Sequence, residues 1–199
     1  MTYADWAEGI ARSVLEEPLP RRWVHTQGVA AAARNLAPVL GRHADLLTAA
    51  AWLHDIGYAP ARHDSGFHPL DGARYLRDMQ HADSILCRLV AHHSCAMIEA
   101  AGRGLAADLI REFKPAPHHL TDALIYCDMT AGPHGQPMAV QQRLGEIRAR
   151  YGPEHVVTRA LARSGPQLTA AVARITRKLA QSTPPSRHTR LTPALVGAC

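Results

Sequence analysis

Histidine and aspartate residues recur along this chain at spacings that suit a metal centre. His54 and Asp55 are adjacent, and further candidates lie on both sides of them: His25, His68, His92, His93 and Asp128. Adjacent residues on a helix point about 100° apart, so one turn can offer a nitrogen and an oxygen to one metal, or an oxygen to two. A divalent metal held in this way, with positions left open, lowers the pKa of bound water to roughly 7 and polarises a phosphoryl oxygen. The residue types therefore predict a catalytic metal centre.

The order His25, His54-Asp55, Asp128 resembles the signature of the HD-domain superfamily of helical metal-dependent phosphohydrolases. The apolar segment 49–57 contains the motif, and the segment 68–76 is similar to a second stretch of the family. The resemblance covers roughly residues 20–180. It implies an all-α fold, a compact HD-domain bundle of about seven to nine helices.

The same resemblance implies a ligand set. In members with one metal the four core ligands suffice, whereas members with two metals add a histidine after the HD motif and another on the following helix. His68 stands where the first addition would be, and either His92 or His93 where the second would be. Adjacent helical positions differ by about 100°, so only one of the pair fits the same ion easily, and the sequence leaves the choice open.

Two divalent ions per chain are therefore expected, with iron, manganese, magnesium, nickel or cobalt as candidates. The resemblance implies that Asp55 would bridge the two ions. His54 and Asp55 are also the expected catalytic residues. Asp128 ends an apolar run, where an unpartnered carboxylate is costly to bury, and a metal would be its partner.

Phosphoester hydrolysis requires positive groups that meet the charge on the phosphoryl oxygens. Several candidates lie near the expected ligands in sequence: Arg21, Arg22, Arg62, His63, Arg74 and Arg143. Many family members carry a lysine after His-Asp-Ile-Gly, whereas this chain has Tyr58 at that position. One charge that could neutralise phosphate is therefore missing.

Composition agrees with one enzyme domain. The chain has 199 residues, 47% of them hydrophobic, with a formal net charge of +5. We expect a single HD domain over residues 1–181, its motif core at about 20–130, and a disordered tail over 182–199. The positive charge favours a small anionic substrate, whereas scattered arginines and only 5% aromatic residues disfavour nucleic acid as a partner.

The sequence also predicts a cytoplasmic protein without a membrane partner. No apolar stretch approaches the ~20 residues that span a bilayer, and the N-terminus lacks the pattern of a signal peptide. The four cysteines show no CxxC spacing and would be free thiols. The oligomeric state stays open, and a homo-oligomer is compatible with the sequence.

Hydrophobic periodicity, proline and glycine place the candidate ligands on helices. One or two less regular helices are expected over 94–112, and a loop over 58–67 that could shape the substrate pocket. The remaining expected helices span about 3–16, 21–40, 43–57, 69–80, 82–93, 120–129, 140–151, 153–163 and 166–181.

Three functions remain compatible with this pattern. The first is hydrolysis of a nucleotide or another small phosphoester by metal-activated water. The second is a mixed-valent di-iron oxygenase that acts on a small organophosphonate or polyol, because some HD proteins use the same six ligands for that chemistry. The third is a regulatory module that binds a nucleotide without turnover, although the complete ligand set argues against it. We favour the phosphohydrolase.

Overall fold

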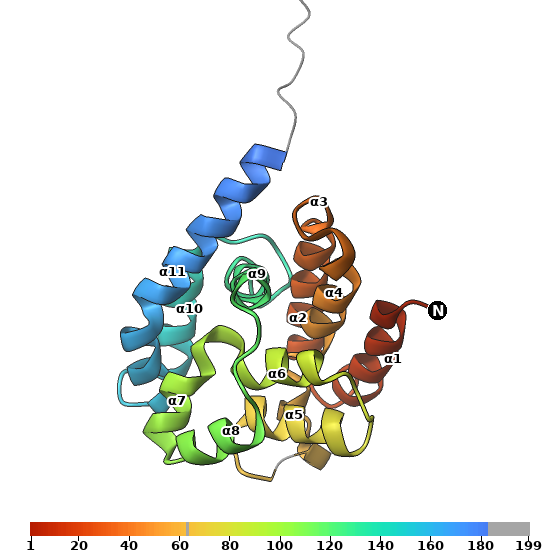
Figure 1. Ribbon diagram of the computed structural model, residues 1–199. Helices are drawn as coiled ribbons and strands as arrows, with labels where there is room; N and C mark the ends of the chain where they lie inside the picture. The colour runs from red at the N-terminus through yellow and green to blue at the C-terminus, as the bar shows by residue number, and fades with distance from the viewer. Residues whose placement is uncertain (63, 183–199) are drawn as a thin grey trace, which may run out of the picture.

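The protein, described here by a computed structural model over residues 1–62 and 64–182, is built of α-helices. Figure 1 shows α9 end-on at the centre, between α2 and α4 on one side and α10 and α11 on the other. Nine helices in the described ranges have eight or more residues: α1 (Tyr3–Leu15), α2 (Pro20–Arg34), α4 (Ala44–Leu53), α5 (His68–Asp78), α6 (Ser84–His92), α7 (Ala96–Arg103), α9 (His118–Met129), α10 (Val140–Tyr151) and α11 (Val156–Ser182). Two shorter helices are α3 (Ala37–Leu40) and α8 (Ala106–Glu112). The prediction of an all-α bundle is confirmed.

Helix α4 forms the centre of the main hydrophobic core. All residues from Leu47 to Leu53 are buried, so this helix is enclosed on every side, as expected for a segment that is apolar all round. Helices α1, α2, α6 and α9 pack against it. The start of α1 is fixed by the Asp45 carboxylate, which accepts hydrogen bonds from the backbone N–H groups of Tyr3 and Ala4 at 3.0 and 3.1 Å.

A second, smaller hydrophobic cluster joins α9, α10 and α11. It contains Ile125 and Met129 of α9, Leu144 and Ile147 of α10, and several residues of α11. Helix α9 contributes to both clusters, because Ala123, Leu124 and Cys127 belong to the main core. The end of α9 therefore lies where the two clusters meet.

Two predicted helices and one predicted loop differ from the structure. The segment 21–40 is two helices, because α2 ends at Arg34 and Pro38 lies in the first turn of α3, where its missing N–H is not needed. Helix α4 ends at Leu53, so His54 is its C-cap and Asp55 lies outside it. A 3₁₀ helix follows as η2 (Ile56–Tyr58). The predicted loop 58–67 holds a further 3₁₀ turn at Pro60–Arg62.

The two helices predicted over 153–163 and 166–181 are one continuous helix, α11, which passes through Pro166. Proline normally interrupts a helix because it lacks an N–H and its ring crowds the preceding turn. Here Pro166 lies on the exposed face, while Leu161, Leu168 and Ile175 on the opposite face are buried. Packing of that apolar stripe holds the helix together across the proline.

No helix in the described part of the chain is long and apolar enough to cross a membrane. The predicted tail 182–199 lies outside the described residues, apart from Ser182 at the end of α11.

Candidate metal centre

Three of the candidate ligands meet at the centre of the bundle. His25 from α2, His54 from the end of α4 and Asp128 from α9 are all buried, and one ligand atom of each lies within 4.8 Å of the others. The Nε2 atom of His25 is 3.1 Å from Oδ1 of Asp128. We call these three residues the inner group.

A second set of three lies beside the inner group. Asp55 follows α4, His68 begins α5 and His93 follows α6, and their ligand atoms also lie within 4.8 Å of one another. The Nε2 atoms of His68 and His93 are 3.1 Å apart, and Oδ1 of Asp55 is 3.4 Å from the former and 3.9 Å from the latter. We call these three residues the outer group.

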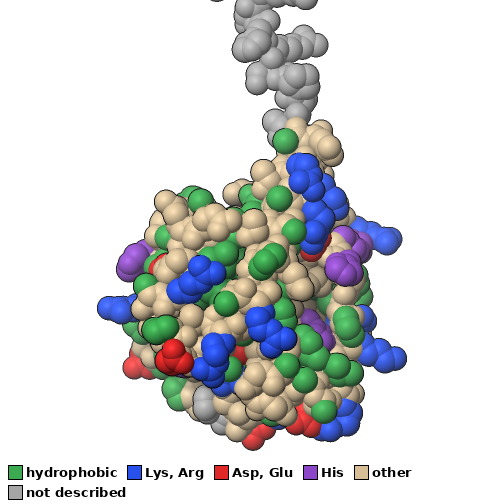
Figure 2. All heavy atoms as spheres, turned by 90° about the vertical axis from the view of Figure 1, so that its left-hand side faces the viewer, with side chains coloured by type: hydrophobic (Ala, Val, Ile, Leu, Met, Phe, Trp, Pro, Cys, Tyr) green, Lys and Arg blue, Asp and Glu red, His purple; other side chains and the backbone are tan. Residues whose placement is uncertain are grey.

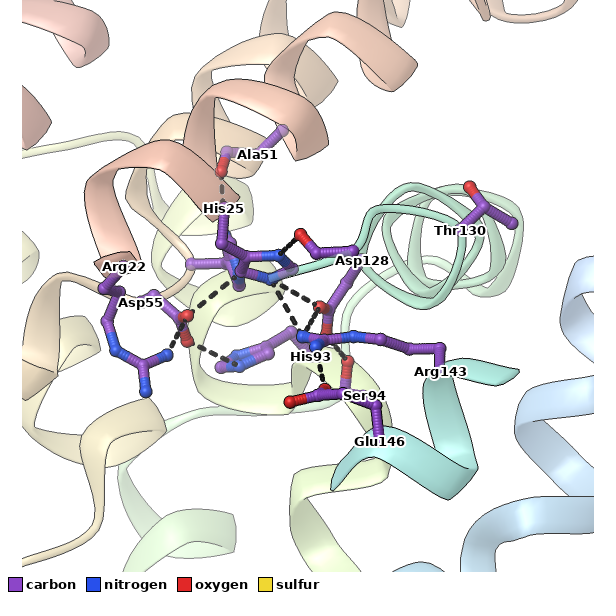
Figure 3. A network of polar contacts seen from close by, with 12 residues as sticks. Arg22, His25, Ala51, Asp55, His93, Ser94, Asp128, Thr130, Arg143 and Glu146 are labelled. Carbon is purple, nitrogen blue, oxygen red and sulfur yellow. Dashed lines mark hydrogen bonds and ion pairs between the residues drawn. The ribbon is translucent and has the colours of Figure 1, made fainter. Parts of the chain in front are cut away.

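Asp55 connects the two groups. Its Oδ1 faces the outer group, whereas its Oδ2 is 3.4 Å from Nε2 of His54. Figure 3 shows the Asp55 carboxylate between Arg22 and the imidazoles. One carboxylate therefore presents its two oxygens to the two groups.

Three of the four histidines are oriented by the backbone. In each, Nδ1 lies within hydrogen-bond distance of a carbonyl oxygen, which fixes the proton on Nδ1 and leaves Nε2 with a lone pair. The pairs are His25 with Gly132 at 3.0 Å, His54 with Ala51 at 2.8 Å and His93 with Val90 at 2.7 Å. Carbonyl contacts of this kind usually orient histidines that bind metals.

The nitrogen and oxygen atoms that face each other in the site fit a bound cation. The Nε2 atom of His54 is buried without a hydrogen bond and faces an oxygen of Asp55. The Nε2 atom of His25 faces Asp128, and the Arg143 guanidinium lies beside both side chains. For His54, a lone pair that faces a carboxylate oxygen requires a cation between them, either a proton on the imidazole or a metal ion. The donor set therefore fits divalent metal ions.

Two arginines border the site. Arg22 donates a hydrogen bond to Oδ2 of Asp55. Arg143 of α10 lies 3.1 Å from Nε2 of His25 and 3.6 Å from Oδ1 of Asp128, and it donates to Glu146 at 2.6 Å. Both guanidinium groups thus lie against candidate ligands (Figure 3).

The local charges set the protonation of the ligands. Burial would raise the pKa of Asp55, but the charges of Arg22 and His54 hold this pKa well below its ordinary value. Burial likewise opposes ionisation of Asp128, yet the hydrogen bond from His25 and nearby positive charge lower its pKa. Burial is the main reason that the pKa of His68 and that of His93 are lowered. Burial alone would lower the pKa of His54, but the Asp55 carboxylate raises it. Anionic carboxylates and neutral imidazoles are the states that bind metal, so a metal ion would displace a proton from His54.

Ser94 and Tyr58 contribute to the site without having been predicted as site residues. The Ser94 hydroxyl donates to Oδ2 of Asp128. Tyr58 stacks on His68 with ring centroids 3.8 Å apart, and the Arg22 guanidinium lies 3.5 Å from the Tyr58 ring centroid. The Tyr58 hydroxyl is 3.4 Å from that of Tyr151. Only the position of Tyr58 after the HD motif could have drawn attention to it.

Several predicted site residues lie elsewhere. His92 points away from both groups, with Nε2 2.7 Å from the carbonyl oxygen of Phe113. Arg62 covers the ring of Tyr75 at 3.9 Å, and Arg74 pairs with Glu112 at 2.6 Å. Arg21 lines a neighbouring hollow rather than the pocket at the two groups, and His63 lies outside the described residues.

A pocket opens from the two groups toward α10 and α11. Its lining includes Arg22, Asp55, His68, His93 and Asp128, together with Arg143 and apolar residues of the last two helices. A ligand in this pocket would therefore contact both the candidate metal ligands and the two arginines.

Comparison with known proteins identifies the fold family. The family model for the HD domain matches residues 22–128, more than half of the chain, and this range contains every residue of both groups. No curated protein matches the chain, and neither does any solved structure. The chain thus belongs to the HD domain family, whose members are in general metal-dependent phosphohydrolases.

Proposed function

We propose that the protein is a metal-dependent phosphohydrolase that acts on a small phosphoester. The observation that carries this proposal is the juxtaposition of the inner and outer groups, joined through Asp55, with Arg22 and Arg143 in one pocket. A binding module without turnover would not need six such residues in this arrangement.

The inner group would hold one divalent ion and the outer group a second. These ions would supply Lewis-acid polarisation of the phosphoryl group and would activate a water nucleophile. Of the two adjacent histidines, we propose His93 as the ligand, because its Nε2 faces His68 and Asp55. We propose His54 and Asp55 as the catalytic residues, because the inner and outer groups meet at these two side chains.

Arg22 and Arg143 are the cations that we propose for substrate binding. The planar guanidinium of Arg22 lies over Tyr58, which restricts its orientation, and Arg143 is held by Glu146. Guanidinium groups fixed in this way can each donate to phosphoryl oxygens in an orientation set before the substrate arrives. Arg62 and Arg74 are already engaged with Tyr75 and Glu112 and are not proposed for this role.

The surface supports a small anionic substrate. On the face formed by α10 and α11, lysine and arginine side chains lie at separate places among hydrophobic and neutral ones (Figure 2). A nucleic-acid backbone instead favours a continuous stripe of positive charge. We also propose that residues 1–181 form one domain, because α9 belongs to both hydrophobic clusters.

The test is phosphate release by chelator-treated protein with and without added Mn²⁺, Co²⁺, Ni²⁺, Mg²⁺ or Fe²⁺, over a panel of phosphomonoesters and nucleotides. The proposal requires metal-dependent release that is lost in the Arg143→Ala variant. Dioxygen consumption is measured in parallel, because oxygenases of the same superfamily use a similar ligand set. Consumption of dioxygen without phosphate release from any ester would replace the hydrolase with the oxygenase.

A further inference from the structure

The pocket is formed by two different parts of the chain. One side consists of residues within the matched range 22–128, including both groups of candidate ligands. The opposite side consists of residues of α10 and α11, which lie after that range. Those two helices therefore add a wall that the family match does not include.

Most of this wall is apolar. It includes Ile147 of α10 and Val157, Ala160, Leu161 and Leu168 of α11. Four of these five residues belong to the smaller hydrophobic cluster or pack against it, so the wall is the edge of a packed core, and all of its side chains except Val157 are buried. Such a surface favours an apolar ligand group because the group leaves water when it binds.

The charged residues near this wall are already paired. Arg150 contacts Glu146 at 3.5 Å, and Glu99 accepts a hydrogen bond from Arg103 at 2.8 Å. The positive charges that face the metal-binding end come from Arg22 and Arg143, as described above. Charge is therefore concentrated at one end of the pocket, while the other end is suited to an uncharged group.

Ser164 is a polar residue of the same wall. This residue of α11 lines the pocket and is only 3% exposed, but its hydroxyl is not one of the buried polar atoms that lack a partner. A hydroxyl at the pocket surface can be hydrogen-bonded by water or by a ligand. Ser164 can therefore offer a bound ligand a polar contact beside the apolar residues.

We infer that the substrate is a phosphomonoester of a compact, uncharged and largely apolar alcohol, aryl or branched alkyl, whose organic group binds against α10 and α11. The reaction at phosphorus rests on the proposed function, whereas binding of the organic group does not. In hydrolysis the bond between phosphorus and the ester oxygen breaks. Water supplies the new oxygen on phosphorus and the proton of the released alcohol.

Calorimetric titration with two phosphonates that cannot release an alcohol tests the inference without turnover. Phenylphosphonate should bind the metal-loaded full chain at least about tenfold more tightly than methylphosphonate, because only the former has an apolar ring to bury. The Ala160→Leu variant narrows the wall and should remove this preference while leaving methylphosphonate affinity unchanged. Ala162→Leu is the matched control, because Ala162 lies on the exposed side of the same helix.

The outcomes separate the inference from the proposed function. Equal binding of the two phosphonates, or no binding of either, would overturn the inference even if phosphoesters are hydrolysed. A preference for phenylphosphonate that Ala160→Leu removes, together with no hydrolysis of any ester, would support the inference and reject the proposed function. Thermal unfolding of both variants shows whether they are folded. If a variant does not fold, the comparison of the two phosphonates on the wild-type chain still tests the inference.

Discussion

The inner and outer groups contain similar residue types but are held in different ways. His25 and His54 of the inner group are buried in the main core, and backbone carbonyls orient both imidazoles. In the outer group, His93 is oriented by the Val90 carbonyl, whereas His68 has a side chain 11% exposed and is held by stacking on Tyr58, with no backbone carbonyl contact among the described residues. Main-chain contacts are more rigid than side-chain stacking, so we expect the inner group to bind its ion more tightly.

The largest effect is expected for Asp55→Ala, because Asp55 faces both groups. This variant should lose metal from the outer group, weaken binding at the inner group and reduce activity by at least about a thousandfold. Arg22 would also lose its partner, and breaking a buried pair costs about 3–5 kcal/mol, with a smaller cost here because Arg22 is partly exposed. Elemental analysis and far-ultraviolet circular dichroism measure metal content and helical structure. Unchanged metal content would remove the bridging role of Asp55.

His68→Ala should distinguish the two groups directly. The expected result is loss of one of two ions per chain, because His68 belongs to the outer group alone. His92→Ala is the matched control and should retain both ions, because His92 contacts Phe113 rather than either group. Metal content per chain, measured after equal dialysis, compares the variants. A larger loss in His92→Ala than in His68→Ala would contradict the assignment of the outer group.

Ser94 should influence the inner group through Asp128. Replacement by glycine removes the hydroxyl and suits the backbone, whose φ of 49° lies in the left-handed region. Replacement by alanine removes the same hydroxyl but adds backbone strain of roughly 1 kcal/mol relative to glycine. Both variants should bind the inner ion about tenfold to a hundredfold more weakly, whereas Ser94→Gly should unfold less readily than Ser94→Ala, because alanine keeps the Cβ that serine already has. If the metal affinity of the two variants instead differed in the same order as their free energies of unfolding, the Ser94 hydroxyl would have no separate role in metal binding.

Glu112→Gln should have the smallest effect, because Glu112 pairs with Arg74 and Arg77 away from both groups. We expect a loss of no more than about 1 kcal/mol in unfolding free energy at pH 7 and no change in bound metal. The hydrogen bond from Arg74 is the main cause of the lowered pKa of Glu112. A carboxyl group with a lowered pKa stabilises the fold at pH values above its ordinary pKa. This contribution is lost as the pH falls through the pKa of the folded state. Urea unfolding at pH 7 and pH 3 should therefore show the difference between variant and wild type shrinking at the lower pH.

The motif predicted much of this arrangement because its residues are fixed by regular structure. His25 and Asp128 lie inside helices, and the apolar runs that carry them identify those helices in the sequence. The choice between His92 and His93 could not be predicted. The chain leaves the helix at His93, and Ser94 and Cys95 then adopt left-handed conformations that no local pattern indicates.

Distance along the chain was a poor guide to the arginines that we propose for substrate binding. Arg74 is only six residues from His68 but pairs with Glu112, whereas Arg143 contacts His25 across a separation of 118 residues. Such contacts depend on how α10 packs against the rest of the bundle. The continuity of α11 across Pro166 likewise depends on tertiary packing, which outweighs the local preference of proline.

Titration of the chelator-treated chain with Co²⁺, followed by elemental analysis of the dialysed protein, determines how many ions the two groups bind. Two ions per chain should bind in two steps, and His68→Ala should leave the tighter step unchanged and abolish the weaker one. Binding of no ion, or of a single ion that His68→Ala leaves in place, would contradict a centre built from two groups.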